Sequence, residues 1–491
     1  MVSQEIRESR GVGQGAALRG ALASLSLSML MPSLDTSIAN VGLPTLAQAF
    51  GASFQAVQWI VLAYLLALTA LIVSAGRLGD LFGRKRLLLC GIGLFTAASL
   101  LCGVAPSLGV LVAARAAQGL GAALMMALTL ALVSETVPRE STGSAMGLLG
   151  TVSAVGTALG PSLGGVLIAG LGWRMIFLVN VPLGLLNLAL AQRTLPQDRA
   201  VARRTQAGFD ARGTLLLALT LAAYALAMTL GHGHPGPRNA ALLGAAALGG
   251  LLFVRSQRSA PSPLLRLAML RDAALGAGLA MSGLVSTVMM ATLVVGPFYL
   301  SLGLGLDAAR VGLVMSAGPL VAALAGVPVG RLVDRLGTAR MTQVGLGGMC
   351  AGLLALATAP GVFGVAGYLG SVVVVTAHYA LFQAANNTRV LGAAGPEQRG
   401  VVSGMLGLAR NLGLVTGAAV LGAVFALASG TAELAAARPE AVAAGMRTTF
   451  LVAAGLVLAA LGMARRRGEG GEARWRRASL TPTLSQRERE D

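Results

Sequence analysis

Long apolar runs recur along almost the whole chain, and this feature restricts the fold more than any other. A helix that crosses a bilayer needs about 20 mostly apolar residues. Because lipid offers the backbone no hydrogen-bond partners, only helices and closed barrels cross it, and barrel strands give short alternating segments instead. The 491 residues are 55% hydrophobic and 11% charged, too little charge to cover a soluble domain of this length. The chain is therefore predicted to be an all-α polytopic membrane protein.

Fourteen transmembrane helices are expected from these runs, which short polar loops separate. The predicted spans are 18–44, 55–76, 87–105, 108–134, 143–170, 175–192, 213–231, 239–254, 273–300, 309–329, 341–359, 362–387, 400–428 and 445–463. An even number of crossings places both termini on the same side of the membrane.

The net charge of +18 raises the question of a nucleic-acid partner, and its distribution argues against one. The segments on one side of the predicted membrane carry 30 of the 37 Lys and Arg side chains. The other side carries Arg174, Arg238, Arg310, Arg438 and Arg447, while Arg115 and Arg410 fall in apolar runs. Because cytoplasmic loops collect Lys and Arg, both termini are predicted to be cytoplasmic. The expected partners are the lipid bilayer and a small molecule, with no nucleic acid.

A loop motif occurs twice in the chain. The loop after the second predicted span reads "GRLGDLFGRKR" (76–86), and the loop after the tenth reads "GRLVDRLGTAR" (330–340). Two six-helix bundles with two extra helices between them would make the two loops equivalent. Such pseudo-symmetric halves, facing each other, are typical of transporters whose substrate passes between them near mid-membrane.

This arrangement divides the chain into five parts. They are a cytoplasmic N-terminus (1–17), an N-terminal six-helix bundle (18–192), linkers with two extra helices (193–272), a C-terminal six-helix bundle (273–463) and a basic cytoplasmic tail (464–491). The polar, basic composition of the tail predicts disorder.

The repeated loop is expected to act as a gate on the cytoplasmic side. Its glycines let helix ends approach closely, and its charged side chains can pair with each other, with neighbouring helices or with helix dipoles. The residues concerned are Gly76, Asp80, Gly83 and Arg84 in the first copy, and Asp334 and Gly337 in the second. The simpler alternative is that the basic residues of the loop only set its orientation in the membrane.

The fifth predicted span carries glycines at every fourth position. Gly156, Gly160 and Gly164 line one face of a helix and allow close backbone approach, and Pro161 bends the helix by removing a hydrogen bond. One interpretation is ordinary small-residue packing. The other is a flexible seam between the two halves that seals against leakage.

Two charged residues fall inside predicted spans of the first half. Asp35 lies in the outer half of the first span, and Arg115 lies about two turns (~11 Å) into the fourth. Because a charge at this depth needs a partner or water, the two are predicted to form an intramembrane ion pair. Gln118 shares the helix face of Arg115. Snorkelling of Arg115 and a local capping role for Asp35 are the alternatives.

A carboxyl group in this setting can couple transport to protons. Burial disfavours its charged form, and a neighbouring guanidinium favours it. A carboxyl held between these effects can bind and release a proton when its surroundings change. Asp35, Arg115 and Gln118 are therefore the predicted proton-coupling residues, with protons as a second partner.

The repeated loop resembles the signature loop of the major facilitator superfamily. Four further stretches are similar to motifs of its fourteen-helix drug:proton antiporter branch: "LDTSIANVGLP" (34–44), "LVAARAAQGLGAALMMA" (111–127), "GTVSAVGTALGPSLGG" (150–165) and "WRMIFLVNVPLG" (173–184). The chain departs from the fourth-helix motif at Ala127, where a proline is common, which leaves the bend of that helix in doubt.

The resemblance implies a secondary active transporter, not an enzyme, that exports amphipathic organic compounds or drugs in exchange for protons across a bacterial cytoplasmic membrane. A dedicated carrier for a single metabolite is the alternative. No acidic residue lies deep in the second-half spans, which implies neutral or monocationic solutes rather than dications. A monomer is expected, with no cofactor or metal.

Other residues give weaker signals. An ATP-binding loop is excluded because the single lysine, Lys85, is followed by arginine. The three cysteines lie in apolar runs without metal-binding spacing. Tyr64 suits an interfacial anchor, and Arg410, near the cytoplasmic third of its span, is expected to be structural.

Overall fold

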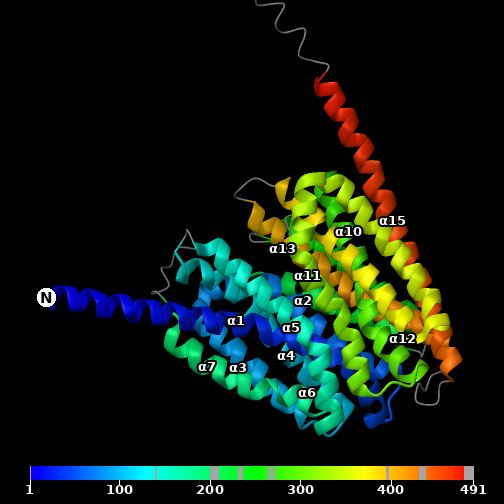
Figure 1. Cartoon of the computed structure of the whole chain (residues 1–491), viewed down its shortest axis with the longest axis horizontal. Helices are drawn as coiled ribbons and strands as arrows, with labels where there is room; N and C mark the ends of the chain where they lie inside the picture. The colour runs from blue at the N-terminus through cyan, green and yellow to red at the C-terminus, as the bar shows by residue number, and fades with distance from the viewer. Residues whose placement is uncertain are drawn as a thin grey trace, which may run out of the picture.

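The computed structural model describes residues 2–479 apart from 139–140, 199–208, 231–235, 261–262, 265–268, 270–271, 394–397 and 431–437. In the first part of the chain these residues form the helices α1 (Val2–Phe50), α2 (Phe54–Phe82), α3 (Arg84–Gly103), α4 (Leu108–Thr136), α5 (Thr142–Leu171), α6 (Met175–Leu178) and α7 (Asn180–Thr194). The pair α8 (Ala211–Thr229) and α9 (Pro237–Ser259) follows. The described residues of the first part thus form a helical bundle followed by a helix pair (Figure 1).

The second part of the chain is also helical. It consists of α10 (Ala273–Phe298), η3 (Tyr299–Gly303), α11 (Ala308–Leu336), α12 (Thr338–Gly392), α13 (Arg399–Thr416), η4 (Gly417–Leu421), α14 (Gly422–Ser429) and α15 (Pro439–Ser479). Helix α15 continues into the segment for which disorder is predicted, and residues 480–491 lie outside the described part. The all-helical prediction is confirmed for the described residues.

Twelve helical segments of the described chain are long and apolar enough to cross a membrane. They do not include α1, whose apolar stretch is diluted by buried polar side chains such as Ser28, Asp35 and Asn40. They count α12 once, although this helix kinks at Gly364 (φ 54°) between the predicted spans 341–359 and 362–387. The expected number of fourteen crossings therefore stays a prediction.

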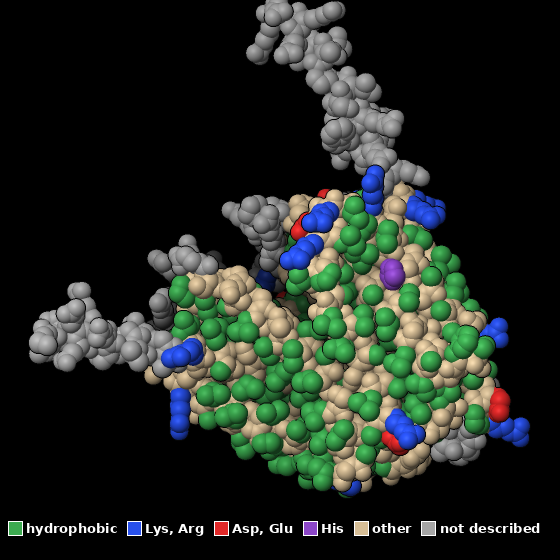
Figure 2. Space-filling view, in the orientation of Figure 1, with side chains coloured by type: hydrophobic (Ala, Val, Ile, Leu, Met, Phe, Trp, Pro, Cys, Tyr) green, Lys and Arg blue, Asp and Glu red, His purple; other side chains and the backbone are tan. Residues whose placement is uncertain are grey.

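The distribution of hydrophobic and charged side chains on the surface is typical of a protein that spans a membrane. Figure 2 shows a broad belt of hydrophobic side chains, with Lys and Arg gathered towards opposite edges of the visible face. The two edges are named here after their loops: the Gly83 face contains the loop between α2 and α3, and the Gly51 face contains the loop between α1 and α2. An apolar belt between charged edges is what a bilayer requires.

Contacts between helices separate two halves. In the first half α1 packs on α5 and α7, while α4 packs on α2 and α3; in the second, α10 packs on α13, and α12 packs on α11 and α15. The halves meet at two flanks, where α5 contacts α11 and where α2 contacts α13 and α14, and they also meet where α1 contacts α10. The core therefore has an N-terminal and a C-terminal part.

The two copies of the loop motif have the same backbone shape. Gly83 ends α2 and precedes α3 with φ 95° and ψ 128°, and Gly337 ends α11 and precedes α12 with φ 86° and ψ 149°. Glycine is favoured at such positive φ because it has no Cβ to clash. The sequence repeat thus corresponds to a repeat in local structure.

Helix α8 is bound along the length of α2. Ser74 and Thr214 share a hydrogen bond of 2.8 Å near one end, and the Trp59 indole N–H donates to Thr229 Oγ1 at 3.1 Å near the other. Helix α8 also contacts η4 of the second half. The α8–α9 pair is therefore attached to the first half and reaches across to the second.

The glycines of α5 face a different neighbour from the one expected for an inter-half seam. A Cβ at Gly156, Gly160 or Gly164 would meet α1 of the same half, at Leu30, Ser37 and Ile38 respectively. The seam interpretation is wrong for these three glycines, because four-residue spacing defines a helix face but not the helix that it contacts.

The contact between the halves at α5 is made by neighbouring positions. A Cβ at Gly312 of α11 would overlap the carbonyl oxygen of Pro161 and lie 3.0 Å from the Cα of Gly165. Pro161 is therefore the member of the predicted set that lies at the α5–α11 seam.

The Gly51 face is closed by aromatic packing between the halves. The Phe54 ring of α2 lies 4.9 Å from the Phe298 ring and 5.1 Å from the Phe425 ring, measured between centroids. All three side chains are buried. Together with the α5–α11 seam, they hold the halves together on this face.

We predict that Gly312→Leu destabilises the protein by about 1–3 kcal/mol, the usual cost of overpacking a tight site. The added side chain would force α5 and α11 apart where Pro161 and Gly165 approach. The measurement is the free energy of unfolding of the purified protein, followed by tryptophan fluorescence. Gly326→Leu, on the same helix with no atom within 4 Å of a Cβ, is the control and should change little. Equal stability of the two variants would contradict the prediction.

Candidate functional site

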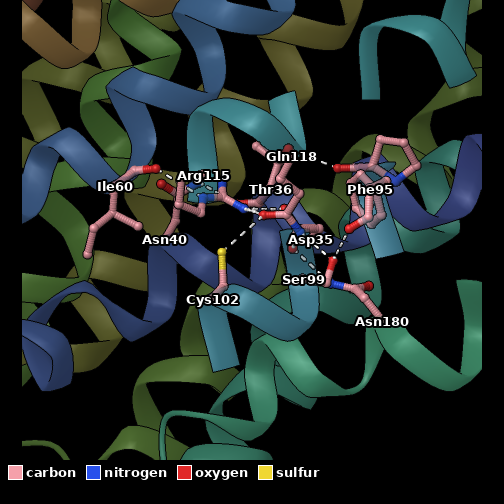
Figure 3. A network of polar contacts seen from close by, with 11 residues as sticks. Asp35, Thr36, Asn40, Ile60, Phe95, Ser99, Cys102, Arg115, Gln118 and Asn180 are labelled. Atoms are coloured by element: carbon pink, nitrogen blue, oxygen red, sulfur yellow. Dashed lines mark hydrogen bonds and ion pairs between the residues drawn. The ribbon is translucent and has the colours of Figure 1, made fainter. Parts of the chain in front are cut away.

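The predicted ion pair within the first half is present. Asp35 on α1 and Arg115 on α4 approach with 2.5 Å between Oδ2 and Nη1 (Figure 3). Gln118, one turn after Arg115, donates from Nε2 to Asp35 Oδ1 at 2.8 Å and accepts from Arg115 Nη1 at 2.6 Å. The structure thus brings the three residues singled out from the sequence into one cluster.

Three further groups complete the network. Asn180, at the start of α7, donates to Asp35 Oδ1 at 2.8 Å, and Ser99 of α3 accepts from Gln118 Nε2 at 2.8 Å. The Arg115 Nε–H donates to the carbonyl oxygen of Ile60 on α2 at 3.0 Å. Five helices, α1 to α4 and α7, therefore meet at one carboxylate and one guanidinium. Sequence reasoning missed Asn180, although it is a polar residue inside an apolar run.

Aromatic rings cover the guanidinium. The Arg115 Cζ lies 4.4 Å from the centroid of the Tyr64 ring and 5.8 Å from that of Phe177. A cation over an aromatic face is attracted by the ring quadrupole. Tyr64 is 1% exposed, so the expectation that it anchors at the membrane interface is wrong. Its ring instead belongs to the pocket that holds the charge.

The network is closed to its surroundings in this state. Asp35 is 1% exposed, and Arg115, Gln118 and Asn180 are 0% exposed. None of these side chains lines the cavity between the halves. Arg115 Nη2 and Asn180 Oδ1 are buried without a hydrogen-bond partner among the described residues. Unpaired buried polar groups cost free energy, so a rearrangement that gives these two atoms hydrogen-bond partners would be favourable.

A cavity of about 470 Å³ lies between the halves on the side of the Gly83 face. Figure 2 shows the surface hollowed in this region. Side chains from α1, α2 and α4 line it from the first half, and side chains from α10, α12 and α13 line it from the second. Since the Gly51 face is packed, the structure has the arrangement of a transporter with one side open.

The first copy of the loop motif is held by ion pairs within its own half. Arg84 Nη2 lies 2.8 Å from Asp80 Oδ1, and its Nη1 lies 2.9 Å from Glu135 Oε1 at the end of α4. The predicted pairing of Asp80 with Arg84 is thus present, and Glu135 is a partner that sequence reasoning missed. Gly76 lines a small cavity beside this loop.

Asp198 forms a second connection to the same loop. Its carboxylate accepts from the backbone N–H groups of Lys85 and Arg86 at 2.9 and 3.0 Å, where it caps the start of α3. Lys85 Nζ in turn donates to the carbonyl oxygens of Gln192 and Leu195 at 2.9 and 2.7 Å. A carboxylate at a helix N-terminus is favourable because of unpaired N–H groups and the helix dipole. The segment after α7 is therefore fastened to the gate loop.

The second copy of the loop motif makes fewer contacts. Asp334 and Gly337 are exposed at the end of α11. Among the ion pairs of the described residues, none includes Asp334. The two copies share backbone geometry but differ in their side-chain partners.

Comparison with known proteins agrees with the fold. The family model described as Major Facilitator Superfamily matches residues 25–418. The uncharacterized transporter YebQ of Escherichia coli is 33% identical over 79% of this chain and 84% of that protein. Multidrug resistance protein Stp of Mycobacterium tuberculosis is 35% identical over 68% of this chain, and the match covers 62% of its own length.

A solved structure has a similar fold. The crystal structure of a bacterial homolog to the human lysosomal transporter Spinster, in an inward-facing and unoccupied conformation, aligns with a TM-score of 0.65 at 17% sequence identity. The alignment covers 91% of this chain and 96% of that chain. By its sequence and by its two-halved helical fold, the chain belongs to the Major Facilitator Superfamily of membrane transporters.

Proposed function

We propose that the protein is a proton-coupled antiporter that exports amphipathic organic compounds across the bacterial cytoplasmic membrane by alternating access. It acts as a monomer with fourteen crossings, obtained when α1 and the two arms of α12 are each counted, and with the Gly83 face in the cytoplasm. The buried pair of Asp35 and Arg115 carries this proposal. Charged side chains inside a membrane bundle are energetically costly, and their presence therefore marks a functional site.

The proton step takes place at Asp35. With the Gly51 face closed, the carboxylate is held by Arg115, Gln118 and Asn180, all buried. Opening of that face would admit water and let Asp35 bind a proton from outside. A neutral Asp35 releases Arg115 from its ion pair, which favours a different packing of the five helices. A proton moving inward releases about 2.3 kcal/mol per 100 mV, which can drive export of a solute.

In alternating access one face of the transporter closes while the other opens, and here these are the Gly51 face and the Gly83 face. Phe54, Phe298 and Phe425 join the halves on the Gly51 face, while the cavity lies towards the Gly83 face. The glycine motif loops at Gly83 and Gly337 act as the gate on the open side, and the α5–α11 seam at Pro161 acts as the seal on the closed side. The similarity to a multidrug resistance protein supports organic compounds as the solutes.

We predict that Asp35→Asn abolishes proton-driven transport. The amide has no acidic proton to exchange, although its size and most of its hydrogen bonds are retained. The measurement uses proteoliposomes with an imposed proton gradient and a panel of anionic, neutral and cationic fluorescent amphiphiles. Asp307→Asn is the control, because Asp307 is an exposed carboxylate at the start of α11, outside the Asp35 network, and asparagine also caps helices well. Gradient-driven transport by Asp35→Asn at the wild-type rate would refute the proton role.

We predict that Arg115→Gln lowers the free energy of unfolding by about 3–5 kcal/mol, because it leaves the buried carboxylate of Asp35 without its counter-charge. The double variant Asp35→Asn with Arg115→Gln should recover a large part of this loss, since no charge then remains buried. The measurement is equilibrium unfolding of the purified variants. Additive losses in the double variant would show that the two side chains are not energetically coupled.

A further inference from the structure

A second arginine lies within a membrane-spanning segment, and the proton mechanism does not use it. Arg410 lies on α13, ~14 Å along the helix from Val401, where the span begins. Its side chain is exposed in the cavity between the halves. Among the described residues it has neither a hydrogen bond nor an ion pair. An unpaired guanidinium at this depth calls for an anion or water.

The cavity around Arg410 has two chemically different walls. The first half contributes an apolar wall, which consists of Met29, Ile72, Val73, Met126, Ala127 and Leu130. The second half contributes Leu391, Leu406 and Leu408 and also all of the polar side chains, which are Ser282, Gln383, Asn387, Ser403 and Arg410. A ligand that fits both walls has an apolar body and a polar end.

The charge of the lining selects the sign of that polar end. Arg410 is the single charged residue of this lining, and no carboxylate lines the cavity among the described residues. The adjoining cavity adds a second guanidinium, that of Arg77. A cationic ligand in the main cavity would therefore meet the like charge of Arg410, and no carboxylate of the lining would balance it.

Acidic groups on the same face lie elsewhere. Asp80 and Glu135 are paired with Arg84, and Asp272 lines a separate pocket with Leu275 and Val390. The lining of the main cavity itself therefore carries a net positive charge.

Size and chemistry narrow the ligand further. A volume of about 470 Å³ lies within the range of small-molecule pockets. The planar guanidinium binds carboxylate, sulfonate or phosphate through two parallel hydrogen bonds. Met29 and Met126 on the opposite wall are flexible enough to pack against apolar bodies of varied shape.

We propose that this cavity is a binding site for amphipathic organic anions, with Arg410 as the residue that binds the anionic group. This assignment rests on the proposed transport function, and it specifies the class of solute that the transporter carries. It replaces the neutral or monocationic solute expected from the sequence and the purely structural role expected for Arg410. Amides and hydroxyls from α10, α12 and α13 complete the polar wall around the bound anion.

The test uses three probes that share one apolar body: pyrenebutyrate, pyrenebutanol and pyrenebutylammonium. Their dissociation constants are measured by fluorescence with purified protein in nanodiscs of zwitterionic lipid. The wild-type protein should bind the carboxylate at least tenfold more tightly than the alcohol, and the ammonium most weakly.

Variants of the lining assign this preference to Arg410. Arg410→Gln should weaken carboxylate binding about tenfold and leave alcohol binding within twofold, while Arg410→Lys should keep most of the preference. Arg310→Gln, an exposed arginine on the opposite face, is the matched control. Asn387→Asp provides an independent variant: a carboxylate in the same lining should weaken binding of the anion and strengthen binding of the ammonium.

Two results would overturn the proposal. One is an equal or tighter affinity of the wild-type protein for the ammonium. The other is an anion preference that Arg410→Gln leaves unchanged. Nanodiscs containing phosphatidylglycerol distinguish a solute from a lipid headgroup: displacement of pyrenebutyrate by this lipid, without pyrenebutyrate transport in proteoliposomes, would assign the cavity to lipid and refute the solute assignment.

The binding assay is independent of proton coupling. Asp35→Asn changes the packing of the first half but leaves Arg410 and the other polar lining residues of the second half in place, so the ratio of carboxylate to ammonium affinity should be kept. Loss of proton-driven transport with intact preference would support both proposals. Proton-independent transport with intact preference would refute only the coupling mechanism, and proton-driven transport without preference would refute only the anion site.

Discussion

The ion pair between Asp35 and Arg115 is the interaction on which the organisation of the first half depends. Neither charge is tolerated alone in an apolar bundle, and each must be satisfied by groups from other helices. The side chains of Gln118 and Asn180 and the carbonyl of Ile60 meet this need, and Ser99 binds Gln118, so five helices are held to one point. A change in protonation at this point is therefore felt by the whole half. In the proposed mechanism, this network is the link between a single proton and a movement of helices.

The second half is organised differently. Its arginine in a spanning segment, Arg410, faces an open cavity rather than a buried partner. In the mechanism proposed here the two halves have different roles: the first encloses a charge pair that a proton would break, and the second presents a charge that a ligand would bind. Because the two sites share no residue, energy must pass between them through the packing of the halves. The aromatic contact of Phe54 with Phe298 and Phe425 is one place where it can do so.

The sequence predicted the helical class, the repeated loop and the Asp35–Arg115–Gln118 cluster, because charges inside apolar runs and matching motifs are visible in one dimension. It could not predict Asn180 or Ser99, since a polar residue in an apolar run does not reveal which helix it contacts. The same limit explains the error at Gly156, Gly160 and Gly164, whose spacing is correct but whose neighbour is α1. Asp198 was missed because capping of α3 comes from a segment more than 100 residues later.

The hydrogen bonds that tie α8 to α2 bear on how the two halves face the lipid. The halves meet along two flanks, one at α2 with α13 and α14, and one at α5 with α11. Because α8 lies against both α2 and η4, it covers the first flank and moves with the N-terminal half. The two flanks are consequently unequal towards the lipid, because α8 covers only the flank at α2. The α8–α9 pair thus makes the two flanks of a fold built from two similar halves different from each other in the plane of the bilayer.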